Sequence, residues 1–192
     1  MKPARITVVG LETSGLDPAR HDVVEVAWQD LETGREGVFI PPHHPNKVLA
    51  NADLDTLRIN RYIDRIPYEK QDTRGNGFRA LANELNGFDV ILAGANPAFD
   101  AAFLSKLERM YNEEEADGAD LFWHHRLLDV EVLAVKHFGV DVLNDGIPSL
   151  HQVLEQLGLE TPAEHTALAD VRTTATALRV LLQIDEPLPL AA

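Results

Sequence analysis

The sequence contains no cysteine, which excludes disulfide bonds and thiolate metal sites and favours a reducing compartment. It also has no apolar run that approaches the roughly 20 residues of a membrane-spanning helix. The apolar run that follows Arg5 is too short for the hydrophobic part of a secretory signal. We therefore expect a soluble, cytoplasmic protein that has no membrane partner.

Basic residues are scarce as well. Lys and Arg number 17 against 31 Asp and Glu, which gives a formal net charge of -14. A protein that holds long nucleic acids through their phosphates normally has a basic face, so unaided affinity for long strands should be modest. An acidic nucleic-acid enzyme is still consistent with this charge if metal ions supply the local positive charge or a partner holds the substrate.

A Gly-x-Gly-x-x-Gly fingerprint does not follow the first predicted strand, which argues against a nucleotide-binding Rossmann protein. Internal repeats and interdomain linkers are also absent. At 192 residues, 45% of them hydrophobic, the chain is long enough to bury a real core. We expect one domain over residues 1–184 and a flexible tail over 185–192, which contains two prolines.

The order of the predicted elements favours an α/β fold with a mixed sheet. Apolar and β-branched runs predict strands at 5–9, 22–30, 36–40, 89–93 and 122–128. Helical spacing of apolar residues predicts a brief helix near residues 54–59 and longer helices at 77–85, 130–138, 150–157 and 167–182. A further helix is expected to start at Pro97, with Asn96 as its cap and an apolar stripe of Phe99, Ala102, Phe103, Leu107 and Met110.

Three carboxylates stand at the ends of these elements. Glu12 follows the first strand, and Asp100 and Asp170 lie in the first turns of helices. If they converge where open α/β sheets bind ligands, they form a metal site. Two divalent ions about 4 Å apart activate water and stabilise the leaving oxygen of a phosphodiester. His165, in a loop five residues before Asp170, suits proton abstraction from that water.

Simpler interpretations exist for each residue taken alone. Any one of the three carboxylates could be a helix cap or a surface residue. We interpret Glu25, on the second strand, as a structural partner at the sheet edge. The pairs His43-His44 and His124-His125 do not predict a zinc site, because adjacent side chains point in different directions.

Three motifs resemble those of the DEDDh 3′-to-5′ exonucleases, which include the proofreading subunit of bacterial replicative polymerases and ribonuclease T. Residues 10–18, Gly-Leu-Glu-Thr-Ser-Gly-Leu-Asp-Pro, resemble the first motif, Asp-x-Glu-Thr-(Thr/Ser)-Gly-Leu. Residues 96–100, Asn-Pro-Ala-Phe-Asp, resemble the second, and residues 165–170, His-Thr-Ala-Leu-Ala-Asp, the third. The resemblance extends from about Arg5 to Leu182, and its histidine separates this branch from relatives that have tyrosine in the same role.

This resemblance implies a ribonuclease H-like, DnaQ-like fold in which helices flank a mixed five-stranded sheet. It implies two-metal-ion hydrolysis with Mg²⁺ or Mn²⁺, with Glu12, Asp100 and Asp170 as metal ligands and His165 as the general base. It also implies substrate contacts from Thr13, Leu16, Asn96 and Phe99. The expected substrates are 3′ ends of single-stranded DNA or RNA, and a DNA polymerase or another replication protein is a candidate partner.

Gly10 departs from the pattern, because it stands where the family has its first aspartate. In the family that aspartate contacts both ions and is the main protein ligand of the second. The resemblance therefore implies that Glu12 and Asp170 hold one ion here, while Asp100 reaches the second through water. Loss of one electrostatic stabiliser typically lowers a rate on the order of 10² to 10³-fold, so we expect weakened or abolished catalysis.

Three explanations of Gly10 are open: a substitution made to trap a substrate or product, a natural loss of catalysis, or replacement of the missing ligand by Asp17 or Asp129. Two functions are open accordingly. The first is a 3′-to-5′ exonuclease weakened by Gly10, and the second is a non-catalytic nucleic-acid-binding or replication scaffold module that retains the exonuclease fold. No motif distinguishes DNA from RNA, since that choice depends on contacts to the 2′-hydroxyl.

Overall fold

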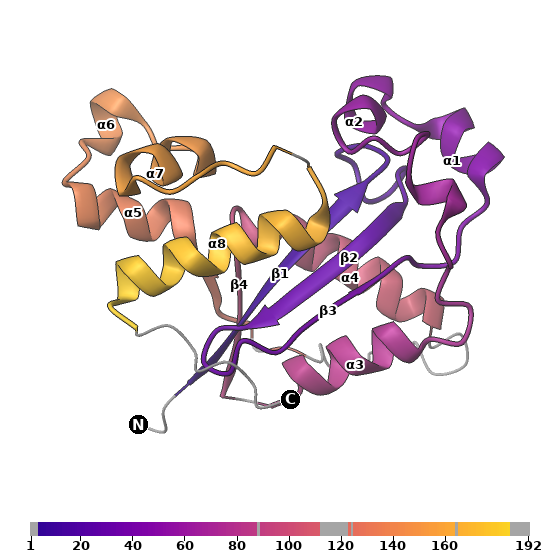
Figure 1. The fold of residues 1–192 in the computed structure, drawn as a ribbon, viewed down its shortest axis with the longest axis horizontal. Coiled ribbons are helices and arrows are strands. Elements are labelled where there is room, and N and C mark those ends of the chain that lie inside the picture. The colour runs from indigo at the N-terminus through magenta and orange to yellow at the C-terminus, as the bar shows by residue number, and fades with distance from the viewer. Residues whose placement is uncertain (1–3, 88, 112–122, 124, 164, 185–192) are drawn as a thin grey trace.

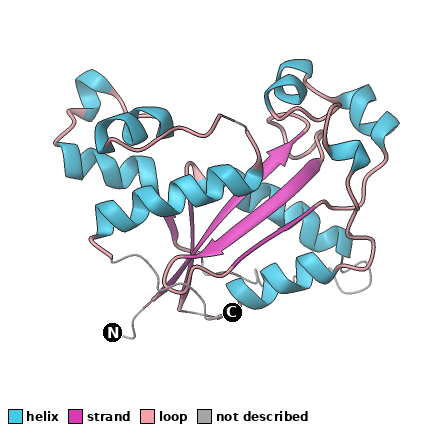
Figure 2. Ribbon diagram, in the orientation of Figure 1, coloured by secondary structure: helices cyan, strands magenta, loops and turns pink. Residues whose placement is uncertain are grey.

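A five-stranded sheet forms the centre of the computed structural model, which describes residues 4–87, 89–111, 123, 125–163 and 165–184. The strand order is β3-β2-β1-β4-β5, with helices on both faces (Figure 1). The strands are β1 (Arg5–Thr13), β2 (Val23–Asp30), β3 (Glu36–Phe39), β4 (Val90–Gly94) and β5 (Leu127–Asp129). The pairs β1–β2 and β2–β3 are antiparallel, whereas β4 is parallel to β1 and β5 is parallel to β4 (Figure 2). The predicted mixed α/β sheet is confirmed.

Most predicted helices lie where the sequence pattern indicates. The helices are α1 (Pro45–Asn51), α2 (Leu54–Ile59), a 3₁₀ turn η1 (Ile66–Tyr68), α3 (Asn76–Leu85), α4 (Pro97–Tyr111), α5 (Val130–Phe138), α6 (Val142–Asp145), α7 (Leu150–Leu157) and α8 (Ala167–Leu182). The bounds predicted for α5, α7 and α8 agree with the structure. Short α1 and α6 were not predicted, because they contain too few residues to give a clear helical pattern.

Strand β1 contributes to the cores on both faces of the sheet. Fully buried Val8 packs in the cluster formed with α5, α7 and α8, whereas Val9 packs in the cluster formed with α3 and α4. Successive side chains of a strand point to opposite faces, so the even-numbered residues of β1 face α8. Gly10 and Glu12 therefore lie on the α8 face.

The structure corrects the predicted end of the first strand. The strand continues from Val9 to Thr13, so Gly10 and Glu12 lie within it rather than after it. The reason is long-range pairing, since β2 pairs with β1 throughout this stretch and places Glu25 opposite Glu12. The β-branched run in the sequence ends at Val9 and gives no sign of this continuation.

The fifth strand is shorter than predicted. It spans Leu127–Asp129, whereas residues 122–128 were expected. Residues 122 and 124 lie outside the described part of the chain, and Trp123 is buried in the core on the α3 and α4 face. Because β5 pairs with β4 only from Leu92 to Gly94, the apolar pattern overestimates its length.

The N-terminus of α4 also differs from the prediction. Asn96 has a φ of 55° rather than the extended conformation of a usual N-cap, and its carbonyl accepts a hydrogen bond from the Phe99 amide at 3.0 Å. The buried face of the helix contains Asp100, Phe103, Leu104, Leu107 and Glu108. Ala102 and Met110, expected in the apolar stripe, are exposed. A 3.6-residue repeat that starts from Asp100 places Ala102 on the opposite side of the helix, whereas Met110 lies at the margin of the buried face in the last turn.

In the part of the chain that the structure describes, no helix has the length and apolar character to cross a membrane. The predicted tail at 185–192 lies outside the described residues. The cytoplasmic location stays a prediction.

Candidate active site

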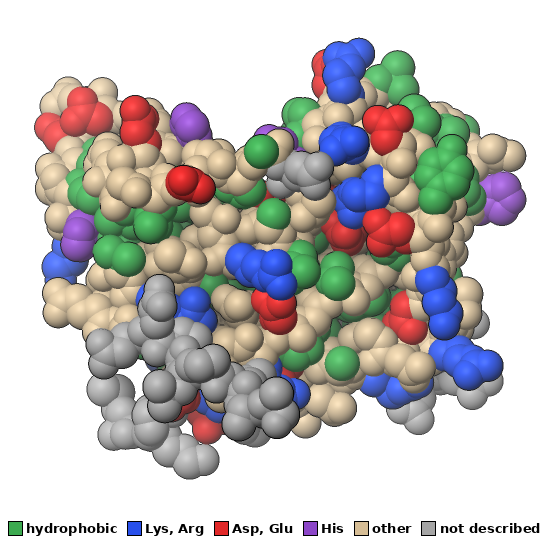
Figure 3. All heavy atoms as spheres, in the orientation of Figure 1, with side chains coloured by type: hydrophobic (Ala, Val, Ile, Leu, Met, Phe, Trp, Pro, Cys, Tyr) green, Lys and Arg blue, Asp and Glu red, His purple; other side chains and the backbone are tan. Residues whose placement is uncertain are grey.

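A pocket of about 310 Å³ opens at the end of β1, between α4, α7 and α8. Its lining includes β1 residues from Val9 to Glu12, Ala95 after β4, and residues of the loop between α7 and α8. Figure 3 shows that this face of the molecule is hollowed between the α5–α7 side and the α1–α2 side. The chain therefore has a recess at the edge of the sheet where ligands of α/β proteins commonly bind.

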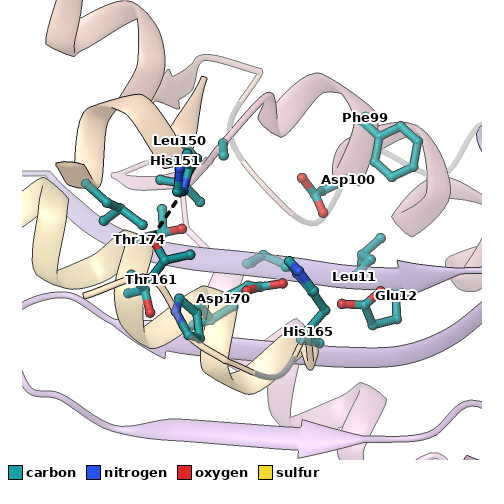
Figure 4. A pocket seen from close by; sticks show the side chains of 18 residues that line it. Leu11, Glu12, Phe99, Asp100, Leu150, His151, Thr161, His165, Asp170 and Thr174 are labelled. Carbon is teal, nitrogen blue, oxygen red and sulfur yellow. Dashed lines mark hydrogen bonds between the residues drawn. The ribbon is translucent and has the colours of Figure 1, made fainter. Parts of the chain in front are cut away.

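All four predicted catalytic residues line this pocket. Glu12 comes from β1, Asp100 from the first turn of α4, and Asp170 from the first turn of α8. Figure 4 shows their carboxylates around one cavity. His165 also lines the pocket and is exposed, which leaves its imidazole accessible to a ligand. Residues separated by up to 158 positions along the chain thus meet, as the motif pattern predicts.

Glu12 lies in an environment that opposes its negative charge. Its pKa is raised to about 8, mainly by burial and in addition by the negative charges of Asp170 and Glu25, while Arg65 acts in the opposite direction. Without a cation, Glu12 is protonated over much of the physiological pH range. A positive ion in the pocket would therefore favour its ionised form.

Asp100 and Asp170 show the same tendency. Burial raises the pKa of Asp100 to about 8, although hydrogen bonds from the backbone amides of Asp100 and Leu11 act against the shift. Burial also raises the pKa of Asp170, and the charge of Glu25 adds to this effect, whereas His165 lowers it. Strongly shifted carboxyl groups in one recess are typical of catalytic and metal-binding sites.

The site fits a divalent ion only in part. In the described segments, no three His, Asp or Glu side chains are arranged closely enough to hold a single ion. Among the three carboxylates predicted as ligands, the charge of Asp170 acts on Glu12, which places these two closest to a shared ion. Two carboxylates suit Mg²⁺ or Mn²⁺, because such ions keep several water molecules and take further oxygen ligands from a substrate. The residues therefore fit one ion held mainly by this pair.

Gly10 lines the pocket at the point where β1 packs against α8. A Cβ atom at this position would lie 2.9 Å from Val171 Cγ2 and 3.6 Å from the Ala167 carbonyl oxygen. The first contact is closer than real Cβ atoms tolerate. Gly10 thus allows α8 to approach β1, and an aspartate here requires Val171 to move.

The predicted substrate contacts lie in different places. Phe99 lines the pocket. Leu16 is 71% exposed in the turn after β1. Thr13 is buried, and its hydroxyl donates a hydrogen bond to the Gly15 carbonyl at 2.8 Å, so the hydroxyl stabilises that turn. Asn96 is exposed and does not belong to the pocket lining.

The two carboxylates considered as replacements for the missing ligand are capping residues outside the pocket lining. Asp17 Oδ1 accepts a hydrogen bond from the Ala19 amide at 2.9 Å. Asp129 is the N-cap of α5, and its Oδ1 accepts from the Glu131 amide at 2.9 Å. Neither Asp17 nor Asp129 therefore lies where it could replace the carboxylate that is missing at position 10.

Sequence reasoning missed two groups of residues at this site. His151 and Thr161 line the pocket, and His151 Nδ1 lies 3.2 Å from Thr161 Oγ1. Arg65 forms an ion pair with Glu25 beside Glu12, at an Nη1–Oε1 distance of 2.6 Å. No short motif includes these positions, and Arg65 lies in a stretch with little periodicity, so only the tertiary structure identifies them. Glu25 lies on β2, an interior strand, and not on the edge strand that was expected.

The fold and the acidic pocket together define a ribonuclease H-like nuclease. The sequence profile described as "RNase_T: Exonuclease" matches residues 8–178. The chain therefore belongs to this exonuclease family, of the DEDDh and DnaQ-like type. Exonucleases of this family generally use divalent metal ions.

Curated relatives span two kinds of protein. An oligoribonuclease of Idiomarina loihiensis is 26% identical over 188 residues, which are 93% of this chain and 92% of the relative. A PolC-type DNA polymerase III of Thermotoga maritima is 28% identical over 174 residues, which are 90% of this chain but only 11% of the polymerase.

Solved structures share the fold at low identity. Exonuclease I of Methylocaldum szegediense superimposes with a TM-score of 0.66 and 20% identity, covering 94% of this chain and 40% of that longer chain. The nuclease domain of 3'hExo, a DEDDh family member bound to rAMP, gives a TM-score of 0.65 at 13% identity, covering 100% of this chain and 98% of that domain.

Proposed function

We propose that this protein is a 3′-to-5′ exonuclease that hydrolyses phosphodiester bonds of short single-stranded nucleic acids. The observation that carries the proposal is the convergence of Glu12, Asp100 and Asp170 on one pocket, with His165 accessible beside them. Family membership supports the reaction class. The net charge of -14 supports short substrates, because little positive charge is available to hold a long phosphate backbone.

The proposed cofactor is Mg²⁺ or Mn²⁺, held by Glu12 and Asp170 with support from Asp100. When bound, such an ion lowers the pKa of water and neutralises charge that develops on the leaving oxygen. His165 takes the proton from the attacking water, since its imidazole lines the pocket and is exposed there. Phe99 contacts the sugar or base of the terminal nucleotide from the α4 side, and Leu16 contacts it from the turn after β1.

The charge of the pocket is compatible with one bound divalent ion and with two. Glu12, Asp100, Asp170 and Glu25 supply four negative charges, and Arg65 supplies one positive charge beside them. One divalent ion would leave the group with a net charge of -1, and two would leave it with +1. An aspartate at position 10 would add a fifth negative charge and favour a second ion.

The test uses 5′-labelled RNA and DNA strands of two to ten nucleotides with Mg²⁺ or Mn²⁺. We expect slow removal of nucleotides from the 3′ end, visible as a ladder of shorter labelled products. Glu12→Gln and Asp170→Asn should abolish it. Because Val171 blocks a side chain at position 10, the restored enzyme is the double variant Gly10→Asp with Val171→Ala, and it should be faster by at least tenfold. Intact strands in both the wild type and the double variant would refute catalysis.

A non-catalytic module that binds 3′ ends or a replication protein is the second candidate, and Gly10 is the observation that favours it. The PolC-type relative supports a DNA polymerase as the partner, since a matching segment there belongs to a polymerase. This candidate predicts that an oligonucleotide binds equally well to the wild type and to Glu12→Ala. It also predicts that neither the wild type nor the double variant hydrolyses it with any metal.

A further inference from the structure

Glu25 and Arg65 form an ion pair beside the catalytic pocket, in which the carboxylate is buried and the guanidinium is partly exposed. Glu25 is 3% exposed and lies directly opposite Glu12 in the β1–β2 register. Arg65 Nη1 donates to Glu25 Oε1 at 2.6 Å, and Nη2 donates to Oε2 at 3.1 Å. This two-point geometry is the strong form of an arginine–carboxylate interaction. Arg65 thereby offsets the repulsion between two carboxylates that face each other across adjacent strands.

The same carboxylate also holds the beginning of α8. Glu25 Oε2 accepts a hydrogen bond from the backbone amide of Ala167 at 2.9 Å, and this contact is buried. Ala167 is the first residue of α8, two residues after His165 and three before Asp170. The first amides of a helix have no partner within the helix, and the helix dipole favours a negative charge there. Glu25 therefore fixes the place where α8 starts.

Arg65 is itself tied to the end of β1. Its Nη2 lies 3.4 Å from the Asn60 carbonyl oxygen, and the Asn60 side chain donates to the Thr13 carbonyl at 2.9 Å. Asn60 is fully buried. The cluster of Glu25, Arg65 and Asn60 thus connects three parts of the chain, namely β1, β2 and the first turn of α8.

We propose that Glu25 and Arg65 are positioning residues that hold Asp170 and His165 in place relative to Glu12. This inference rests on the proposed exonuclease function of the pocket. Neither residue needs to touch the substrate, because both act through the Ala167 amide and the start of α8. Gly10 packs closely against Val171, which provides a second contact between β1 and α8. This packing brings α8 close to β1, and the Glu25–Arg65 ion pair then sets the orientation of α8.

A structural role alone would produce loss of stability without a change at the pocket. The chain offers a matched control in Glu84, which is 4% exposed and accepts a hydrogen bond from Arg5 Nη2 at 2.8 Å. Arg5 begins β1, whereas Glu12 lies near its other end. Glu84→Gln should therefore disrupt a comparable ion pair, between a buried glutamate and a partly exposed arginine, far from the pocket.

The experiment compares Glu25→Gln, Arg65→Met, Arg65→Lys and Glu84→Gln by calorimetric titration with Mn²⁺ and by amide hydrogen exchange. Loss of an outer-shell partner typically weakens metal binding 10- to 100-fold, and we expect about this loss in Glu25→Gln and Arg65→Met. Exchange at the Ala167 amide should accelerate about tenfold in Glu25→Gln, while amides in the middle of α8 keep their protection. Arg65→Lys should lose less Mn²⁺ affinity than Arg65→Met, because it retains the charge.

Glu84→Gln should lower the melting temperature and leave both Mn²⁺ affinity and Ala167 exchange unchanged.

Unchanged Mn²⁺ affinity and unchanged Ala167 exchange in a folded Glu25→Gln protein would overturn this inference. If Glu25→Gln does not fold, Arg65→Met decides, and wild-type Mn²⁺ affinity in a folded Arg65→Met protein would overturn the inference as well. Failure of the proposed function gives a different result, since the wild type itself would then neither bind Mn²⁺ nor shorten an oligonucleotide. In an active preparation, kcat should fall in Glu25→Gln with KM changed less than about twofold, since only the geometry of the reacting groups is altered.

Discussion

Gly10 affects both the packing of α8 against β1 and the number of carboxylates in the pocket. An added Cβ atom would approach Val171 Cγ2 to 2.9 Å, and valine in a helix has one strongly preferred rotamer. Gly10→Asp alone should therefore lower the free energy of unfolding by about 1–3 kcal/mol, the usual cost of overpacking. Urea denaturation of the two single variants and the double variant measures this effect.

Val171→Ala should relieve part of that cost, so the two substitutions should be less destabilising together than the sum of their separate effects. Additive effects would contradict the contact. Calorimetry of the double variant with Mn²⁺ should also give a stoichiometry nearer two than one, because the pocket then has one more carboxylate.

The carboxyl group of Glu12 makes stability depend on pH in the metal-free protein. Its pKa is about 8 in the folded chain against 4.5 as the ordinary value, so the folded state binds the proton more tightly. This favourable contribution is complete below about pH 4.5 and is lost as the pH rises to about 8. With a chelator present, the wild type should lose more stability than Glu12→Gln between pH 5.5 and 8.5, as measured by urea denaturation.

The difference should amount to a few kcal/mol at most, since solvent reaches part of the side chain. Parallel pH profiles for the two proteins would show that Glu12 is not shifted. Mn²⁺ affinity should rise over the same pH range, because ion binding releases the proton.

Sequence motifs predicted the residues that line the pocket but not their surroundings. Glu12, Asp100, His165 and Asp170 carry a spacing that the family shares, so they were accessible from the sequence. The orientation of Thr13 and Asn96 depends on a buried turn and on a backbone φ of 55°, which no motif specifies. The role of Arg65 depends on an ion pair across 40 residues of sequence.

Asp170 lies in the first turn of α8 and His165 in the loop just before it, so the N-cap of α8 affects the position of both groups. Thr166 Oγ1 accepts a hydrogen bond from the Ala169 amide at 3.1 Å. Thr166→Ala should lower the free energy of unfolding by about 1 kcal/mol, and it should also weaken Mn²⁺ binding, because Asp170 follows within the same turn.

Ser149→Ala on α7 is the comparison, since Ser149 forms a capping box with Gln152. It should cost a similar amount of stability in thermal denaturation and leave Mn²⁺ binding unchanged. Equal effects of both variants on Mn²⁺ binding would contradict a specific role for the start of α8.

At the level of elements, helices were easier to predict than strands. The bounds of α5 and α7 follow from local signals, namely the capping residues Asp129 and Ser149 and a left-handed glycine after each helix. The lengths of β1 and β5 depend on their partner strands. The β-branched run therefore underestimated the first strand, and the apolar pattern overestimated the second.

For the whole molecule, the acidic balance should limit how substrates bind. With a net charge of -14, few phosphates can be neutralised at once. For single strands the slope of log K against log salt is about -0.7 per neutralised phosphate, so we expect a slope no steeper than about -2. Fluorescence anisotropy with strands of 4 and 20 nucleotides, in the presence of Ca²⁺ to slow cleavage, measures it.

The two lengths should bind within a few-fold of each other. A steep salt slope together with much tighter binding of the longer strand would point to an extended basic track that the composition does not suggest.

Successive side chains of β1 pack into two different cores, and this arrangement makes the metal site sensitive to the register of the strand. A slip of β1 by one residue against β2 would turn Glu12 toward α3 and α4 and Val9 toward α8. Such a chain would lose both hydrophobic layers together with the ion site. Metal binding is therefore a sensitive indicator of correct strand alignment during refolding, because no partly assembled sheet presents the same set of oxygens.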